Sequence, residues 1–283
     1  MRRCPSCRTL CALPVPPAGE LAAYYNSDYS VSDAGLTPRR RANWTPLIET
    51  AERGAGARNG LEIGSSTGAF LRLAAKRGWS MAGVELDARA RGQHARSSPG
   101  IPVYPTVEAA RNAGVGGVDA AWVLHTIEHL PDAEAVLREL GGLLAPGALI
   151  VATTPNGRSL ECRVLGRLWE WWTPPAHLAL FSPRGARLLF ERAGLEIVNI
   201  ETRRGDSSGA AANLALAPGR FLKRHLRGER RQLSSVSSTT QRMAACINLL
   251  YDPLSKPVRS ALYHRGLLGP ELVIVARTPS RQA

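Results

Sequence analysis

The order of apolar segments in this chain predicts an α/β fold with a doubly wound, mostly parallel sheet. Short apolar runs of strand length alternate with segments of helical periodicity from about residue 58 onwards. The run 118–124 is apolar throughout after Asp119, which is typical of a strand covered by helices on both faces. A glycine turn at 64–68 joins the first such strand to a helix. These three observations favour a nucleotide-type α/β domain.

Each element follows from a local signal. The lead-in 38–58 carries Trp44, Leu47 and Ile48 at helical spacing, and the first core helix is stopped by Gly78. Strands are expected at 58–63, 79–85, 101–104, 118–124, 148–153, 195–201 and 271–277. Helices are expected at 67–77, 88–95 and 107–111. A further helix is expected where one apolar face is formed by Ala133, Val136, Leu137, Leu140 and Leu144. The last one begins at Ser182-Pro183 and is closed by Gly194.

The chain divides into four predicted segments. Residues 1–37 form an N-terminal appendage with a partial CxxC knuckle and a tyrosine-rich segment, and 38–204 form the core. Residues 205–269 are an arginine-rich, partly amphipathic insertion that we expect to be helical, and 270–283 are the last core strand and tail. A chain of 283 residues can bury one substantial core with such appendages.

The turn Leu61-Glu62-Ile63-Gly64-Ser65-Ser66-Thr67-Gly68 is the strongest functional signal. Its pattern is E-x-G-x-x-x-G rather than the G-x-G-x-x-G of dinucleotide sites, and Glu85 ends the second strand about twenty residues later. Gly64 has no side chain, so a ligand can lie against backbone there, and the Glu85 carboxylate can accept both hydroxyls of a ribose. A glycine turn alone could be an ordinary strand-to-helix connection, but Glu85 at this distance favours a cofactor site.

The turn resembles motif I of the class I S-adenosylmethionine-dependent methyltransferases. This resemblance implies a Rossmann-like, seven-stranded sheet whose last strand runs antiparallel beside the sixth, with S-adenosyl-L-methionine as cofactor. Asp87 is the less favoured alternative to Glu85 for the ribose. The cofactor-binding residues expected on this basis are Glu62, Gly64, Ser65, Gly68, Glu85, Leu86, Leu124 and His125.

The segment His125-Thr126-Ile127-Glu128-His129-Leu130-Pro131 follows the fourth strand, at the sheet edge where ligands bind in such folds. This H-x-x-E-H-L-P pattern resembles the small-molecule methyltransferases that include the quinone O-methyltransferases, over about 24–200 and the final strand. A histidine near the transferred methyl group could remove a proton from a hydroxyl acceptor, so His129, His125 and His177 are the catalytic candidates. Alternatively these side chains only hold the loop or cap the next helix.

A metal is not predicted. In the quinone enzymes the corresponding loop carries two glutamates and a histidine associated with a divalent cation, whereas this chain has His125 in place of the first glutamate. Two histidines and one carboxylate remain chemically capable of binding a metal. At the N-terminus, Cys4 and Cys7 form one knuckle and only Cys11 follows nearby, so a four-thiolate zinc ribbon is incomplete.

Composition restricts the partners. The net charge of +13 comes almost entirely from arginine, since lysine occurs only at Lys76, Lys223 and Lys256. We do not expect nucleic acid as a partner; an acidic small substrate, or peripheral contact with an anionic lipid surface, stays open. No apolar stretch is long enough for a transmembrane helix and no signal peptide is evident, which predicts a cytoplasmic protein.

The predicted activity is methyl transfer to a small-molecule acceptor, such as a hydroxyl of a sugar, lipid-linked glycan, quinone or secondary metabolite. The aromatic loop from Trp169 through Trp171, Trp172 and His177 to Phe181 would be either a wall of the acceptor pocket or a stabilising lid. The alternatives are an RNA or protein methyltransferase, and a non-catalytic partner subunit that retains the fold. We expect a monomer or a homodimer.

Overall fold

The computed structural model describes residues 1–17, 19–21, 35–53, 58–205 and 268–280. Tyr24, Tyr25 and Tyr29, and nearly all of the predicted insertion, therefore lie outside the described residues. The chain forms two compact units. The first contains Met1–Ser30, Pro155–Pro183 and Glu201–Leu272, and the second contains Val31–Thr154, Arg184–Ile200 and Val273–Ala283. The four-segment division made from the sequence stays a prediction.

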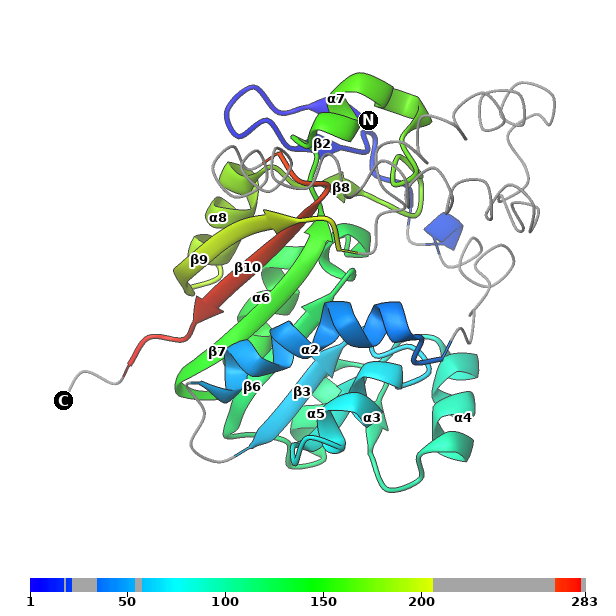
Figure 1. The fold of residues 1–283 in the computed structure, drawn as a ribbon, viewed down its shortest axis with the longest axis vertical. Coiled ribbons are helices and arrows are strands. Elements are labelled where there is room, and N and C mark those ends of the chain that lie inside the picture. Colours follow the sequence, from blue (N-terminus) through cyan, green and yellow to red (C-terminus); the bar gives the residue numbers. More distant parts are fainter. Residues whose placement is uncertain (18, 22–34, 54–57, 206–267, 281–283) are drawn as a thin grey trace. The chain divides into compact units, whose positions relative to one another are not determined.

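A seven-stranded sheet has the order β5-β4-β3-β6-β7-β10-β9. Strands β3, β4, β5, β6 and β7 pair in parallel, and β10 runs opposite to β7 and β9 (Figure 1). The predicted α/β class with an antiparallel last strand is confirmed. The strands are β3 (Asn59–Ile63), β4 (Ser80–Val84), β5 (Val103–Tyr104), β6 (Val118–Leu124), β7 (Leu144–Pro155), β9 (Glu196–Arg203) and β10 (Glu271–Arg277).

Several helices of the second unit begin at side chains that cap them. Thr37 caps α2 by accepting a hydrogen bond from the Arg40 amide, Asp87 and Asp132 cap α4 and α6 in the same way, and α8 begins at Pro183. In Figure 1, α2 and α3 lie in front of the sheet and α6 lies behind it. The helices are α2 (Pro38–Glu52), α3 (Ala69–Ala75), α4 (Ala88–Ser97), α5 (Val107–Asn112), α6 (Ala133–Gly141) and α8 (Pro183–Arg192).

One assignment from the sequence is wrong. Leu144 was expected on the apolar face of α6, but it opens β7 and pairs with Val118. The helix ends at Gly141 because two glycines follow each other there, and Leu143 takes the buried position instead. Between the pairs Val118–Leu144 and Ala120–Leu149 the register shifts, so the expected Pro146-Gly147 turn is a bulge within β7, with Gly147 at φ 76°.

The main core lies between the helices α2 and α3 and one face of the sheet. Trp122 of β6 is fully buried there, and its indole Nε1 donates a hydrogen bond to the Leu47 carbonyl of α2 at 3.2 Å. Phe70 and Trp79 pack against the same indole. This packing fixes the start of α3, and hence the glycine turn before it, against the sheet.

The first unit has a small sheet of its own, in which β2 (Leu10–Cys11) pairs with both β1 (Arg2–Arg3) and β8 (Ala179–Leu180). Leu10 and Leu180 pack with Cys162 and Trp169 from α7 (Leu160–Leu165) and the following 3₁₀ turn η2 (Gly166–Leu168). Among the helices that the structure describes, none has the length and apolar character needed to cross a bilayer. The cytoplasmic location stays a prediction.

Candidate active site

The turn after β3 is held against the neighbouring strand by backbone hydrogen bonds. The amides of Gly64 and Ser65 both donate to the Val84 carbonyl, at 2.8 and 3.0 Å, and the Gly68 amide donates to Ser65 at 2.8 Å. Gly64 and Gly68 have φ angles of 77° and 79°, a region that residues with a Cβ adopt at a cost. The turn therefore requires glycine at both positions for its backbone conformation alone.

Close neighbours add a second requirement at each glycine. A Cβ on Gly64 would collide with the Oγ1 and Cγ2 atoms of Thr126, and one on Gly68 would collide with the imidazole of His94. The Thr126 hydroxyl lies 3.1 Å from the carbonyl oxygens of Ile63 and Leu124, which holds the ends of β3 and β6 together. His94 is 1% exposed, and its Nε2 lies 2.9 Å from the Ile101 carbonyl.

Sequence reasoning missed Thr126 and His94 as supports of the turn. The glycines signalled that something approaches the backbone closely, but the approaching residue lies 62 positions away for Gly64 and 26 for Gly68. No local pattern connects such pairs, because their contact depends on the register of β6 and on the position of α4.

The Glu85 carboxylate is aimed by two backbone amides. Ser66 N donates to one oxygen and Asp87 N donates to the other, both at 2.8 Å. Arg91 fixes the chain from the other side by donating to the carbonyls of Glu85 and Leu86, both at 2.7 Å. Leu86 is 78% exposed, so a ring could lie over its side chain. A carboxylate held in this way is preorganised to accept hydrogen bonds from a diol.

Glu62 is a buried carboxyl group at the end of β3. It is 4% exposed, and its Oε2 has no hydrogen-bond partner among the described residues. Burial, and secondarily the negative charge of Glu85, raises the pKa of Glu62 well above its ordinary value of 4.5. A buried acceptor without a donor is costly, so this position is suited to a ligand that brings a cation or N–H donors.

The other predicted cofactor residues take different positions. The Ser65 side chain is buried, and a Cβ on Gly83 of β4 would meet its Oγ at 2.7 Å, so the hydroxyl faces β4. Leu124 ends β6 and packs against the main core. All of the predicted cofactor residues belong to the second unit, and most lie at the carboxyl ends of β3, β4 and β6.

The residues directly after β6 form a series of polar contacts that involves His125, Glu128 and Thr154. His125 has a φ of 49°, and its amide donates to the Thr153 carbonyl at 2.9 Å. Its Nδ1 lies 3.4 Å from Oε1 of Glu128, which is fully buried and accepts a hydrogen bond from the Thr154 hydroxyl at 2.9 Å through Oε2. Positive φ at a residue other than glycine is uncommon and clusters at functional sites. His129 ends the short 3₁₀ turn Ile127–His129 that follows.

His177 belongs to the first unit. Its Nδ1 lies 2.7 Å from the Trp171 carbonyl, and its amide donates to Thr173 at 3.1 Å, so the tryptophan loop fixes the ring by its own backbone.

In the same unit, hydrogen bonds from Cys7 and Ser6 lower the pKa of Cys4, while burial raises that of Cys11.

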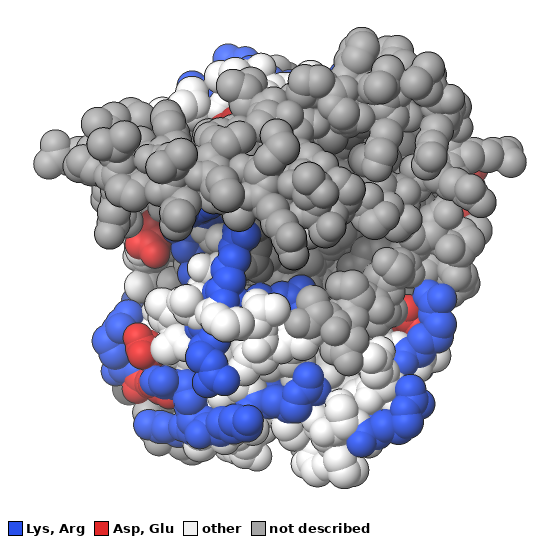
Figure 2. All heavy atoms as spheres, turned by 45° about the vertical axis from the view of Figure 1, so that its right-hand side comes forward, with Lys and Arg blue, Asp and Glu red and all other residues white. Residues whose placement is uncertain are grey.

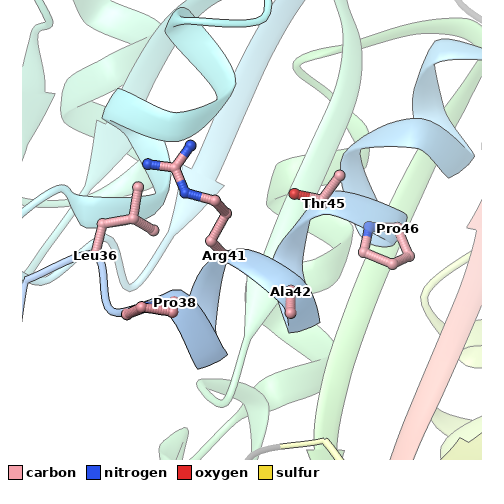
Figure 3. Close-up of a pocket in the computed structure, with 6 residues that line it drawn as sticks. All are labelled: Leu36, Pro38, Arg41, Ala42, Thr45 and Pro46. Atoms are coloured by element: carbon pink, nitrogen blue, oxygen red, sulfur yellow. The ribbon is translucent and has the colours of Figure 1, made fainter.

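An open pocket of about 510 Å³ lies along α2 (Figure 3). The side chains that line it repeat at helical spacing and include one cation, Arg41. Trp44, on the same helix, packs edge-on against Phe70 in the first turn of α3, at 5.8 Å between ring centroids. None of the predicted site residues lines this pocket. The lining residues are Leu36, Pro38, Arg41, Ala42, Thr45 and Pro46.

The residues at the ends of β3 and β4 fit S-adenosylmethionine. Its ammonium group matches the unpartnered oxygen of Glu62, and its ribose diol matches the Glu85 carboxylate. The cofactor carries no phosphate, which agrees with a turn whose amides at 64, 65 and 66 are already used by Val84 and Glu85.

Comparisons with known proteins agree with this geometry. A family model described as a methyltransferase domain matches residues 37–200. Ubiquinone biosynthesis O-methyltransferases of Psychrobacter arcticus and Psychrobacter cryohalolentis are each 30% identical over 119 residues, which cover 38% of this chain and 45% of each relative. The chain thus matches less than half the length of these curated relatives.

Solved structures share the fold. A SAM-dependent methyltransferase from Archaeoglobus fulgidus has a TM-score of 0.51 at 20% identity, covering 83% of this chain and 92% of its own. A putative sarcosine dimethylglycine methyltransferase from Galdieria sulphuraria has a TM-score of 0.53 at 14% identity, covering 92% and 98%. Together with the turn geometry and the family match over more than half of the chain, these findings show that the chain belongs to the methyltransferase-domain family, as a class I enzyme whose cofactor is S-adenosylmethionine.

Proposed function

We propose that this chain methylates a hydroxyl group of a small-molecule acceptor and that His125 is the general base. The observation that carries the proposal is the sequence of contacts from Thr154 to Glu128 to His125 at the carboxyl end of β6. The partial match to ubiquinone biosynthesis O-methyltransferases supports oxygen as the methylated atom.

In this proposal each group has a role. Glu128 is buried and anchored by Thr154, so it favours the His125 tautomer with a proton on Nδ1 and leaves Nε2 as the basic nitrogen. Nε2 then takes the proton of the acceptor hydroxyl as the oxygen attacks. When bound, S-adenosylmethionine supplies an electrophilic methyl group on a sulfonium that leaves as a neutral thioether. Alignment of the acceptor with that methyl group contributes the rest of the rate enhancement.

The cofactor residues act before this step. Glu85 would hold the ribose and Glu62 would face the ammonium group when the cofactor is bound. His129, from the same loop as His125, and His177, from the tryptophan loop, remain alternative bases. His129 ends the 3₁₀ turn that follows His125, and the Nδ1 of His177 lies 2.7 Å from the Trp171 carbonyl.

The test replaces His125, His129 and His177 singly with alanine and measures methyl transfer to a panel of catechols and other hydroxylated acceptors. We expect His125→Ala to lower kcat by about 10²–10⁴-fold, the usual contribution of a positioned base, with the Kd for S-adenosylmethionine changed less than about threefold. Glu128→Gln should lower kcat by a smaller factor and shift the pH–rate profile, because it acts through His125. Unchanged kcat in His125→Ala would exclude this assignment.

A further inference from the structure

The solvent face of α7 and η2 carries an unusual mixture of residues. Leu160, Arg163 and Val164 take the i, i+3 and i+4 positions of α7, and Arg167 follows in η2, beyond the C-cap of the helix at Gly166; all four side chains are exposed. Val164 is 68% exposed and Leu160 is 44% exposed. The opposite side of the helix holds Cys162, which is buried with Leu10 and Trp169. The face that points to water is therefore both aliphatic and basic.

Further arginines of the first unit surround this face. Leu10 of the N-terminal hairpin packs directly on Cys162 of α7, so the hairpin and the helix share one side of the unit (Figure 1). Burial raises the pKa of Cys162 to about 11, against the opposing influence of Arg3, Arg163 and Arg158 around it. Burial also lowers the pKa of Arg158, and the nearby charges of Arg163, Arg3 and Arg8 lower it further. The positive charges of Arg3, Arg8 and Arg163 thus act on Arg158 through space, and the buried carboxylate of Glu161 acts on Cys162 from the same helix.

An anionic surface placed against this side of the unit would be attracted by several arginines at once. Like charges at short range destabilise the folded chain, and several phosphates presented together relieve that repulsion. The chain as a whole is strongly cationic, and basic side chains also outnumber acidic ones among the coloured residues of the face in Figure 2. In the first unit, the hairpin carries Arg2, Arg3 and Arg8, and α7 carries Arg163 beside the exposed Leu160 and Val164.

The exposed apolar side chains indicate which kind of polyanion this surface suits, a nucleic acid or a lipid bilayer. The six large apolar side chains exposed among the described residues are all leucine or valine, and four belong to the first unit: Leu13, Val15, Leu160 and Val164. Proteins that hold single-stranded nucleic acid use exposed aromatic rings to stack bases. Aliphatic side chains ringed by arginine instead suit the boundary between acyl chains and headgroups, as in interfacial amphipathic segments.

We propose that the α7 face, together with Arg3 and Arg8 of the hairpin, docks this enzyme on a bilayer surface rich in anionic phospholipid. Arg163 and the neighbouring arginines contact headgroup phosphates, while Val164 and Leu160 enter the outer edge of the acyl region. The proposal does not depend on the identity of the acceptor or on His125. It predicts attachment that is reversible and weakened by salt, because most of it is electrostatic.

Cosedimentation of the full chain with lipid vesicles tests it. We expect binding to phosphatidylglycerol–phosphatidylcholine vesicles at low salt, at least about tenfold weaker binding to pure phosphatidylcholine vesicles, and loss of binding at high salt. Arg163→Glu should weaken binding to the anionic vesicles by about tenfold or more, since it removes one attractive charge and adds a repulsive one. Val164→Asp should weaken it to a similar extent.

Matched changes in the second unit serve as controls. Val198→Asp alters a valine of β9 that is 54% exposed, and Arg96→Glu reverses an exposed arginine of α4. Both should bind vesicles as the wild type does, and all four variants should bind S-adenosylmethionine normally, which shows that they are folded. Wild-type binding by both Val164→Asp and Arg163→Glu would overturn the proposal. So would binding to mixed-sequence single-stranded RNA without binding to anionic vesicles.

Discussion

The amino ends and the carboxyl ends of strands β3 and β6 differ in how the polar groups near them are hydrogen-bonded. At the amino ends, the Asn59 amide donates to the Asp119 carboxylate at 2.9 Å, and Glu52 accepts two hydrogen bonds from Arg77, at 2.7 and 3.0 Å. At the carboxyl ends, Glu62 is buried with an unpartnered oxygen and His125 has positive φ. One end satisfies its own charges, and the other leaves them for a ligand.

This difference separates residues that stabilise the protein from residues that bind or react. Strain and unsatisfied polar groups cost free energy, and a folded protein retains them where a ligand or a reaction repays that cost. Substitutions at the two ends should therefore affect different measurements.

The largest expected difference is in the affinity for S-adenosylmethionine after substitution of two glycines, Gly64 and Gly114. Gly64 and Gly114 both have positive φ, 77° and 88°, but a Cβ on Gly64 meets Thr126, whereas one on Gly114 meets nothing within 4 Å. We expect Gly64→Arg to abolish detectable binding of S-adenosylmethionine in calorimetry. Gly114→Ala should cost about 1 kcal/mol of stability through backbone strain alone and leave the Kd unchanged. Equal losses of affinity in both variants would show that strain, and not the cofactor cradle, explains the result.

The next difference concerns carboxylates that accept backbone amides. Glu85→Ala removes the acceptor for Ser66 and Asp87 and the proposed ribose contact, so we expect the Kd for S-adenosylmethionine to rise by about 100-fold. Asp119→Ala removes the acceptor for Asn59 at the opposite end of β3 and should lower the free energy of unfolding by about 1–3 kcal/mol. Its Kd should stay within about twofold of the wild type. A large loss of S-adenosylmethionine affinity in Asp119→Ala would contradict the proposed difference between the amino and carboxyl ends of β3.

The smallest expected difference is in the pH dependence of stability. Burial raises the folded-state pKa of Glu62, so the wild type loses stability as pH rises above the unfolded value of 4.5, and Glu62→Gln removes this loss. Hydrogen bonds from Arg77 lower the folded-state pKa of Glu52, so its contribution is present above 4.5 and disappears as pH falls through the folded value.

Urea unfolding at acidic, neutral and mildly alkaline pH measures both effects. Relative to the wild type, Glu62→Gln should become more stable with increasing pH, by about 1–3 kcal/mol, and Glu52→Gln should become less stable. Glu62→Gln should also weaken S-adenosylmethionine binding by about tenfold. A parallel pH response of the two variants would contradict the assigned directions.

Much of the fold could be predicted because its signals are local. Strands β6 and β10 begin and end at the predicted residues, and β3, β4 and α4 agree to within one or two positions. Leu144 was misplaced because an apolar residue at helical spacing also suits a strand, and only the pairing with Val118 decides between them. The residues that support the turn were missed for a related reason, since Thr126 and His94 meet their glycines only in the folded chain.

The sequence by itself determined the class of fold, the position of the glycine turn after β3 and the acidic residue that follows β4, because glycine spacing and strand–helix alternation are properties of neighbouring residues. The tertiary structure alone decided which polar groups are buried and which are held in a fixed orientation by hydrogen bonds. It left Glu62 without a partner for one oxygen, gave Glu85 two amide donors, and joined His125 to Glu128 and Thr154. These properties depend on desolvation and on contacts between distant segments, which no local pattern encodes.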